Sequence, residues 1–206
     1  MSVPDRSIDP KLLEAAKNEF MEKGFEMSSL ASICAGAGVT TGALYKRYSG
    51  KEDLFATIVS DTIKDLEEVF QQKKIDLSKA TDQQIFDAWT MSEEENLQWM
   101  KFLYERREGF TLLVRRAGGT RYGNFTHDWA ERMNRVDYEY YLEARRRDMT
   151  SADITQEEMH ALTSAFWALY YEPFIHGFTW EQMEKHVRTM CGFVDWHRAL
   201  GIEPPQ

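Results

Sequence analysis

Residues 28–51 read SSLASICAGAGVTTGALYKRYSGK, and this stretch decides the fold of the N-terminal part of the chain. Ser28 or Ser29 can begin a helix, because a hydroxyl there accepts from the free amides of the first turn. Apolar residues then recur at every third or fourth position, the period of one buried helical face, namely Leu30, Ile33, Cys34 and Ala37. The stretch therefore predicts a short capped helix.

A glycine turn follows this helix. Gly38 can take the positive φ with which a helix ends, and Val39 comes next as an apolar plug. Thr40 or Thr41 then begins a second helix that continues to about Tyr48. Two short helices joined by a tight turn form the DNA-binding unit whose second helix enters the major groove.

Charge is distributed unevenly along the chain. The 206 residues include 34 acidic ones and carry a net charge of −9, but residues 28–51 contain no Asp or Glu. Residues 1–51 have a net charge of +1, which leaves −10 for residues 52–206. A neutral-to-basic head on an acidic body suits a protein that contacts phosphates with one surface only.

The rest of the chain is predicted to be helical. Asp9-Pro10 begins a helix that should end at Gly24, and Ser49 with Glu52 forms a capping box before a helix from residue 51 to about 72. Further helices are expected to begin near Asn124 and at three pairs of polar residues. These pairs are Ser92 with Glu95, Thr155 with Glu158 and Thr179 with Gln182. Gly109–Gly123 is expected to be a loop or a broken helix. No segment alternates with period two, so we expect an all-α fold of about nine helices without strands.

The N-terminal residues resemble the TetR family of bacterial transcriptional regulators. The resemblance rests on the order and spacing of Leu12, Ala15, Ala16, Phe20, Gly24-Phe25, Ser28-Ser29, Ile33, Ala37-Gly38-Val39, Gly42, Leu44-Tyr45, Tyr48 and Lys51-Glu52-Asp53-Leu54. It implies a three-helix DNA-binding domain over residues 1–51 and a helical effector-binding and dimerisation domain over residues 52–206, connected by the helix that begins at residue 51.

The resemblance also implies which residues contact DNA. Base-facing positions correspond to Thr41, Gly42 and Lys46, and the phosphate-contacting tyrosine and lysine correspond to Tyr45 and Lys51. Ala43 departs from the family pattern, because a hydroxyl residue is common there, and Arg47 is expected to compensate. The complete predicted DNA-binding set is Ser29, Thr40, Thr41, Gly42, Tyr45, Lys46, Arg47 and Lys51.

The last part of the chain contains two apolar seams with helical spacing. Their residues are Met159, Leu162, Phe166 and Leu169 in the first and Trp180, Met183, Val187, Met190 and Val194 in the second. A stripe of Ala161, Ala165 and Ala168 beside the first seam allows close approach of another backbone. Two such helices from each of two chains would form a four-helix bundle across a twofold axis, which the resemblance favours. The alternative is an ordinary core within one chain.

The body is rich in aromatic residues, including all six tryptophans. Helical ligand pockets are commonly lined in this way. We therefore expect a small-molecule effector of unidentified chemistry among Trp99, Phe102, Trp129, Phe166, Trp167, Tyr170 and Phe174. For each ring taken alone, ordinary core packing is the alternative.

Several other functions are disfavoured by the sequence. It has no phosphate-binding loop, nucleophile elbow or zinc-protease helix, so enzymatic activity and a cofactor are not expected. Glu172 and His176 lie four residues apart and His186 and His197 follow, but one such pair is a weak metal signal, and no metal site is expected.

Cys34 and Cys191 occupy apolar positions that favour free thiols. The absence of long apolar runs predicts a cytoplasmic protein without membrane association.

Taken together, the sequence predicts a homodimeric, ligand-responsive transcriptional regulator that binds a pseudo-palindromic operator. A repressor released by a small-molecule effector is the favoured form, and the alternative within DNA binding is an activator or a structural DNA-organising protein. A helical small-molecule binding protein or enzyme, with a head that does not read DNA, is the alternative from another class.

Overall fold

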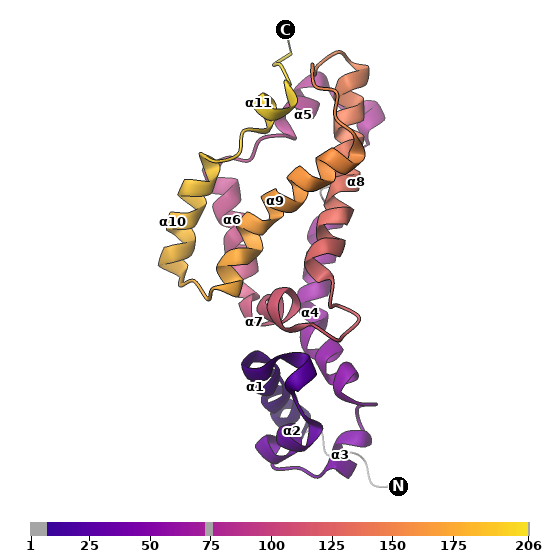
Figure 1. Ribbon diagram of the computed structural model, residues 1–206, viewed down its shortest axis with the longest axis vertical. Helices are drawn as coiled ribbons and strands as arrows, with labels where there is room; N and C mark the ends of the chain where they lie inside the picture. Colours follow the sequence, from indigo (N-terminus) through magenta and orange to yellow (C-terminus); the bar gives the residue numbers. More distant parts are fainter. Residues whose placement is uncertain (1–7, 73–75, 206) are drawn as a thin grey trace. The chain divides into compact units, whose positions relative to one another are not determined.

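The computed structural model describes residues 8–72 and 76–205, and helices dominate both ranges (Figure 1). The helices are α1 (Ile8–Met27), α2 (Leu30–Ala37), α3 (Thr41–Tyr45), α4 (Lys51–Gln72), α5 (Asp82–Asp87), α6 (Glu93–Glu105), α7 (Arg107–Thr111), α8 (Phe125–Arg146), α9 (Gln156–Ile175), α10 (Trp180–Cys191) and α11 (Trp196–Leu200). A 3₁₀ turn spans Leu77–Lys79 and a π-helical turn spans Leu112–Arg116. Within the described ranges no strand forms, and the predicted all-α class is confirmed.

The chain divides into two compact units, which differ from the division expected at residue 51. The first unit, called the head here, comprises residues up to Phe70 together with Arg106–Phe125. The second unit, called the body, comprises Gln71–Glu105 and Thr126 onward. The long helix that begins at Lys51 therefore packs with the head over most of its length.

The core of the head is built from α1, α2, α3 and α4. Phe20, Phe25 and Phe55 form a triangle of rings whose centroids lie 5.3–5.8 Å apart. Leu44 of α3 and Ile33 and Cys34 of α2 are buried in the same cluster. Burial of these side chains explains how a helix as short as α3 is stable, since short isolated helices are marginal in water.

The segment Arg106–Phe125 also belongs to the core of the head. Leu112, Leu113 and Ala117 are buried in the cluster that contains the phenylalanine triangle. The expectation of a loop or broken helix over residues 109–123 captured the irregular backbone, because the π-helical turn interrupts the helix there. It missed the packing, since a glycine-rich stretch gives little sign of burial.

Most predicted helix boundaries are observed. Gly24 has φ 76° and ψ 166°, which breaks the helical geometry of α1, and capping boxes precede α9 and α10 at Thr155 and Thr179. Ser92 accepts from the amide of Glu95, whose carboxylate accepts from the Ser92 amide. These local signals are reliable because each depends on only a few neighbouring residues.

The predicted capping box of Ser49 with Glu52 is wrong. The carboxylate of Asp53 accepts from both the amide and the hydroxyl of Ser49, at 2.9 and 3.3 Å. Glu52 instead accepts from the backbone amide of Arg121, at 3.0 Å. Tertiary contact with the segment Arg106–Phe125 therefore redirects the glutamate, and the next acidic residue takes its place.

In the body α6 packs beside α10, and the first part of α9 crosses α8 (Figure 1). Tyr141 of α8 is fully buried, and its hydroxyl donates to the carbonyl of Ala152 and accepts from the amide of Ile154. Tyr170 of α9 donates to Asn96 of α6. Burial holds the pKa of the Tyr170 hydroxyl well above its ordinary value. These buried hydroxyl bonds fix the register of the body helices.

Two further expectations concern the thiols and the membrane. Cys34 and Cys191 are both free, as predicted. Among the described residues, no helix is both long and apolar enough to cross a bilayer. Residues 1–7 lie outside the described residues.

Gly109 is predicted to be required for packing of α7 on α4. A Cβ atom at this position would overlap Thr62 Oγ1 and lie 3.1 Å from Thr62 Cβ. Gly109→Ala should therefore lower the free energy of unfolding by about 1–3 kcal/mol, measured by urea denaturation.

Gly36→Ala is the matched control for this glycine. Its added Cβ would lie at an ordinary 3.5 Å from Ala15 Cβ, so it should be neutral or stabilise by up to about 1 kcal/mol. Equal effects of the two substitutions would contradict the assigned contact.

Candidate nucleic-acid interface

Helix α2 is positioned by caps at both ends. Ser29 is its N-cap, and the hydroxyl accepts from the amide of Ser32 at 3.0 Å. Gly38 has φ 67° and ψ 31°, and its amide donates to the carbonyl of Ala35. The positive φ is the conformation that glycine adopts without strain. This turn, followed by half-buried Val39, sets the direction in which α3 begins.

Helix α3 presents a polar and aromatic face to solvent. Thr40 caps it by accepting from the amide of Ala43 at 3.2 Å, and buried Leu44 anchors the opposite face. The exposed residues are those predicted to face DNA, namely Thr41, Gly42, Tyr45 and Lys46. Tyr45 has 59% of its surface exposed. A large aromatic ring at this exposure can stack or donate its hydroxyl to a ligand.

Gly42 has no packing role within the described residues. A Cβ atom there would meet only the Thr40 hydroxyl, at 3.9 Å. Glycine costs about 1 kcal/mol of helix propensity relative to alanine. A glycine at an exposed helical position is consistent with a surface on which another molecule approaches the backbone closely.

Lys51 is engaged within the head. Its Nζ donates to three carbonyl oxygens where α1 ends, those of Phe25 at 2.6 Å, Ser28 at 3.0 Å and Glu26 at 3.3 Å. It also lies 4.4 Å from the centre of the Phe25 ring. An ammonium group has three N–H donors, and all three are engaged here. Lys51 therefore has a structural role in the head, and its phosphate contact stays a prediction.

Arg47 is likewise engaged within the head. Its guanidinium donates to the carbonyl of Ala43 at 3.0 Å and lies 2.6 Å from the carboxylate of Asp9. Only 10% of its side chain is exposed. This pair joins the end of α3 to the beginning of α1, so Arg47 does not replace the hydroxyl missing at Ala43.

The body contains the aromatic cluster predicted as an effector site. Trp167 of α9 contacts four other rings, with centroids 5.2–6.2 Å away, those of Trp99, Trp129, Phe166 and Tyr170. Phe102 stacks on Trp99 at 5.1 Å, and Phe174 is buried. The structure therefore brings Trp99, Phe102, Trp129, Phe166, Trp167 and Tyr170 into one connected group.

A family described as "Bacterial regulatory proteins, tetR family" matches residues 12–58, which contain α2 and α3. This part of the chain is therefore similar to the N-terminal domain of the TetR family. A curated relative, the HTH-type transcriptional repressor BepR of Brucella suis, is 38% identical over 61 residues. That alignment covers 30% of this chain and 29% of the repressor, so the chain matches less than a third of this relative's length.

Solved structures extend the likeness to the fold of the whole chain. A TetR-family member from Streptomyces coelicolor A3 has a TM-score of 0.58 at 16% identity. The alignment covers 100% of this chain and 94% of that protein. A TetR-like regulator from Rhodococcus sp. RHA1 has a TM-score of 0.55 at 16% identity, with 93% and 100% covered. NalD, described as the secondary repressor of the MexAB-OprM efflux pump in Pseudomonas aeruginosa, has a TM-score of 0.52 at 16% identity, with 91% and 96% covered.

The predicted dimer residues divide into two groups. Met159, Met183, Val187 and Met190 are buried within a single chain, as in the alternative of an intrachain core. The other five are half-buried or exposed, namely Leu162, Phe166, Leu169, Trp180 and Val194. Of these, Leu162 has 40% of its surface exposed. Met183, Val187 and Met190 belong to α10, which lies against α6 in the same chain, whereas Met159 of α9 is buried in the cluster of Trp89, Tyr141, Leu200 and Ile202.

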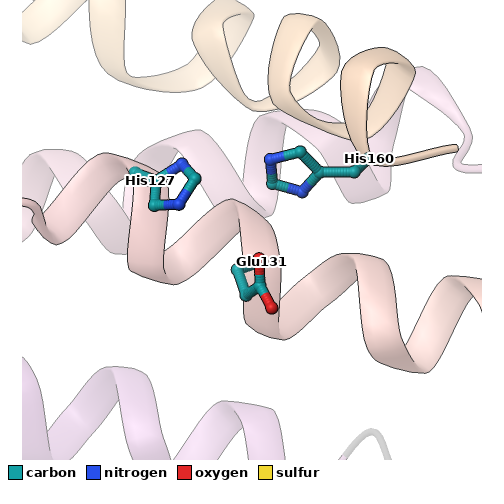
Figure 2. Close-up of side chains that lie close together, drawn as sticks. All are labelled: His127, Glu131 and His160. Atoms are coloured by element: carbon teal, nitrogen blue, oxygen red, sulfur yellow. The ribbon is translucent and has the colours of Figure 1, made fainter. Parts of the chain in front are cut away.

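One histidine and carboxylate cluster was missed by sequence reasoning. His127 and Glu131 of α8 lie close to His160 of α9, as Figure 2 shows. The spacing of His127 and Glu131 by four residues is the signal that could have been noticed. The pair that the sequence did suggest, Glu172 and His176, forms an exposed ion pair at 3.4 Å.

Lys51→Met should destabilise the head. Methionine keeps a similar length but cannot donate to the three carbonyl oxygens, so the free energy of unfolding should fall by about 2–3 kcal/mol in urea denaturation.

Lys46→Met, at an exposed position of α3, is the matched control and should change stability by less than about 0.5 kcal/mol. If the Lys51→Met variant kept native stability but bound DNA more weakly, the structural role would be contradicted. Lys51 would then be assigned the phosphate contact that the resemblance implied.

Proposed function

We propose that this protein is a DNA-binding transcriptional repressor of the TetR family that acts as a homodimer and is released from its operator by a small molecule. The observation that carries the proposal is the exposed face of α3, where Thr41, Gly42, Tyr45 and Lys46 lie in a stretch without acidic residues. Such a helix can place its N-terminal residues at base edges while its flanks contact phosphates. No enzymatic step is part of this proposal, and such a regulator would act in the cytoplasm.

The relative BepR supports repression rather than activation. BepR, a repressor, is similar to this chain over the DNA-binding head. Within the head, we assign base contacts to Thr41, Gly42 and Lys46, and a phosphate contact to Tyr45. The hydroxyls of Ser29 and Thr40 cap helices, and both residues are exposed. Their hydroxyls can therefore also lie beside the DNA backbone.

Dimerisation is proposed to use the exposed apolar face of α9. Ala161, Leu162 and Ala165 lie on the solvent side of this helix, although all three are apolar. Small residues at this spacing allow another helix to approach closely. A twofold dimer would present two α3 helices to half-sites about 34–36 Å apart, the length of one turn of DNA.

The effector is proposed to bind at the aromatic cluster around Trp167. The indole Nε1 of Trp167 is buried and has no hydrogen-bond partner among the described residues. Buried indole N–H groups usually find an acceptor, so an effector with an acceptor oxygen would satisfy this one. Release from DNA requires only that the effector bind more tightly to the conformation that does not fit the operator.

Substitutions on α3 test the DNA-binding proposal. An operator selected by genomic pull-down would be titrated by fluorescence anisotropy at several salt concentrations. Tyr45→Phe should weaken binding to all duplexes about tenfold, because one hydrogen bond to a charged phosphate is lost. Lys46→Ala should cost about 1–3 kcal/mol and relax preference at particular bases.

Lys64→Ala serves as the control, since this exposed lysine lies on α4 outside the recognition helix. Unchanged affinity in both α3 variants, or no preference of the native chain for any inverted repeat over random duplex, would refute the proposal.

Leu162→Glu tests the dimer. A carboxylate on the exposed face of α9 would be buried without a partner in the interface, so the chain should become monomeric in size-exclusion chromatography with light scattering. Leu142→Glu, at an exposed leucine of α8, should leave the dimer intact. If Leu162→Glu were still a dimer, the interface would have to lie on another face.

A further inference from the structure

His127, Glu131 and His160 form a cluster of ligand-type side chains outside the DNA-binding face. One ligand atom from each residue can be chosen so that all three lie within 4.8 Å of one another. The two imidazole rings face each other edge to face, with centroids 5.3 Å apart, and the carboxylate lies beside them (Figure 2). All three residues belong to the body.

The two helices that carry the cluster are joined by two hydrogen bonds near it. His127 and Glu131 lie one turn apart on α8, and His160 lies on α9. Asn134 Nδ2 donates to the carbonyl of Gln156 at 3.2 Å, and the Thr163 hydroxyl donates to Asp137 at 3.4 Å. These bonds hold α8 against α9 near the cluster, so the three side chains are brought together by the fold.

His160 is the residue that most clearly requires a ligand. Its Nδ1 is buried and has no hydrogen-bond partner among the described residues. Its Nε2 lies 3.4 Å from the Ser164 hydroxyl. If Nε2 carries the proton and donates to Ser164, the Nδ1 lone pair is left free, which is the form in which a histidine binds a metal ion.

Glu131 supplies the negative charge of the cluster. Its Oε1 accepts from Arg135 at 2.9 Å, which leaves the other carboxylate oxygen for a ligand. A carboxylate at this place can neutralise part of a cation's charge.

We propose that His127, Glu131 and His160 bind one divalent transition-metal ion, with Zn²⁺ as the best-fitting probe. Two imidazole nitrogens and one carboxylate oxygen are a ligand set that zinc accepts, with one position left for water or another molecule. Ligand atoms bound to zinc at about 2.0–2.2 Å lie about 3–3.5 Å apart. Rotation of the exposed His127 side chain and small shifts of the other two close the present spacing.

The remaining histidines do not form such a site among the described residues. His186 Nε2 bonds to the carbonyl of Leu169 at 2.7 Å, and His197 stacks on Phe86 at 4.0 Å between ring centroids. His176 has only the exposed Glu172 as its charged partner. The cluster on α8 and α9 is therefore the part of the described chain where metal-ligand residues converge.

The proposal is tested by Zn²⁺ binding to the full chain without an affinity tag. The protein would first be treated with a chelator, and Zn²⁺ would then be titrated in competition with a chromophoric chelator. One Zn²⁺ should bind per chain. Single changes His127→Ala, Glu131→Gln and His160→Ala should each weaken binding by more than roughly 100-fold, a larger loss than is typical for residues that only orient a ligand.

Two further variants separate ligation from general effects. Ser164→Ala should weaken Zn²⁺ binding about tenfold, because the hydroxyl orients His160 without touching the metal. His176→Ala, which removes the other histidine spaced four residues from a glutamate, should leave affinity and stoichiometry unchanged. Circular dichroism would establish that each variant is folded, and the exposed position of His127 keeps the test valid should His160→Ala unfold.

Cobalt provides an independent readout of the ligand set. Co²⁺ bound by these three residues should give the visible absorption of a low-coordinate site, and that spectrum should be lost in Glu131→Gln. The proposal would be overturned if the native chain bound Zn²⁺ no more tightly than the His127→Ala variant does. It would also be overturned if the His176→Ala variant lost its bound Zn²⁺. Because the readout is metal binding, its failure is distinguishable from failure of the proposed DNA-binding function.

Discussion

The bonds made by the Lys51 ammonium are the interaction on which the head depends. Three carbonyl oxygens converge where α1 ends and the chain turns into α2, and backbone carbonyls at a helix end need donors. Lys51 supplies them from the first residue of α4, so one side chain joins the end of one helix to the start of another. Helix α3 lies between these elements in sequence and is too short to be stable without them.

This arrangement explains how an acidic chain can present a DNA-binding surface. The cations nearest to α3 in sequence do not share one role: Lys46 is exposed, whereas Arg47 pairs with Asp9 and Lys51 binds carbonyl oxygens. Affinity for DNA in the proposed mechanism therefore relies on few charges and on the shape of the α3 face. Gly42 fits that interpretation because it removes bulk where the backbone would meet the groove.

The body combines two features that serve different chemistry. The rings around Trp167 form an apolar cluster that includes the unsatisfied indole donor of Trp167, whereas the site proposed on α8 and α9 consists of hard and borderline ligands. Both involve α9, which also carries the exposed apolar residues proposed for dimerisation. A helix that takes part in all three functions offers a physical route by which binding in the body could affect assembly.

The sequence by itself determined the all-α class, the helix caps and the glycine turn before α3, because these depend on residues close together in the chain. It also identified the exposed residues of α3. Only the tertiary structure decided that Lys51 and Arg47 bind within the head, that Arg106–Phe125 completes its core, and that His160 meets His127 and Glu131. Each of these contacts joins residues distant in sequence, and a local pattern carries no information about which distant carbonyl, carboxylate or ring a side chain will meet.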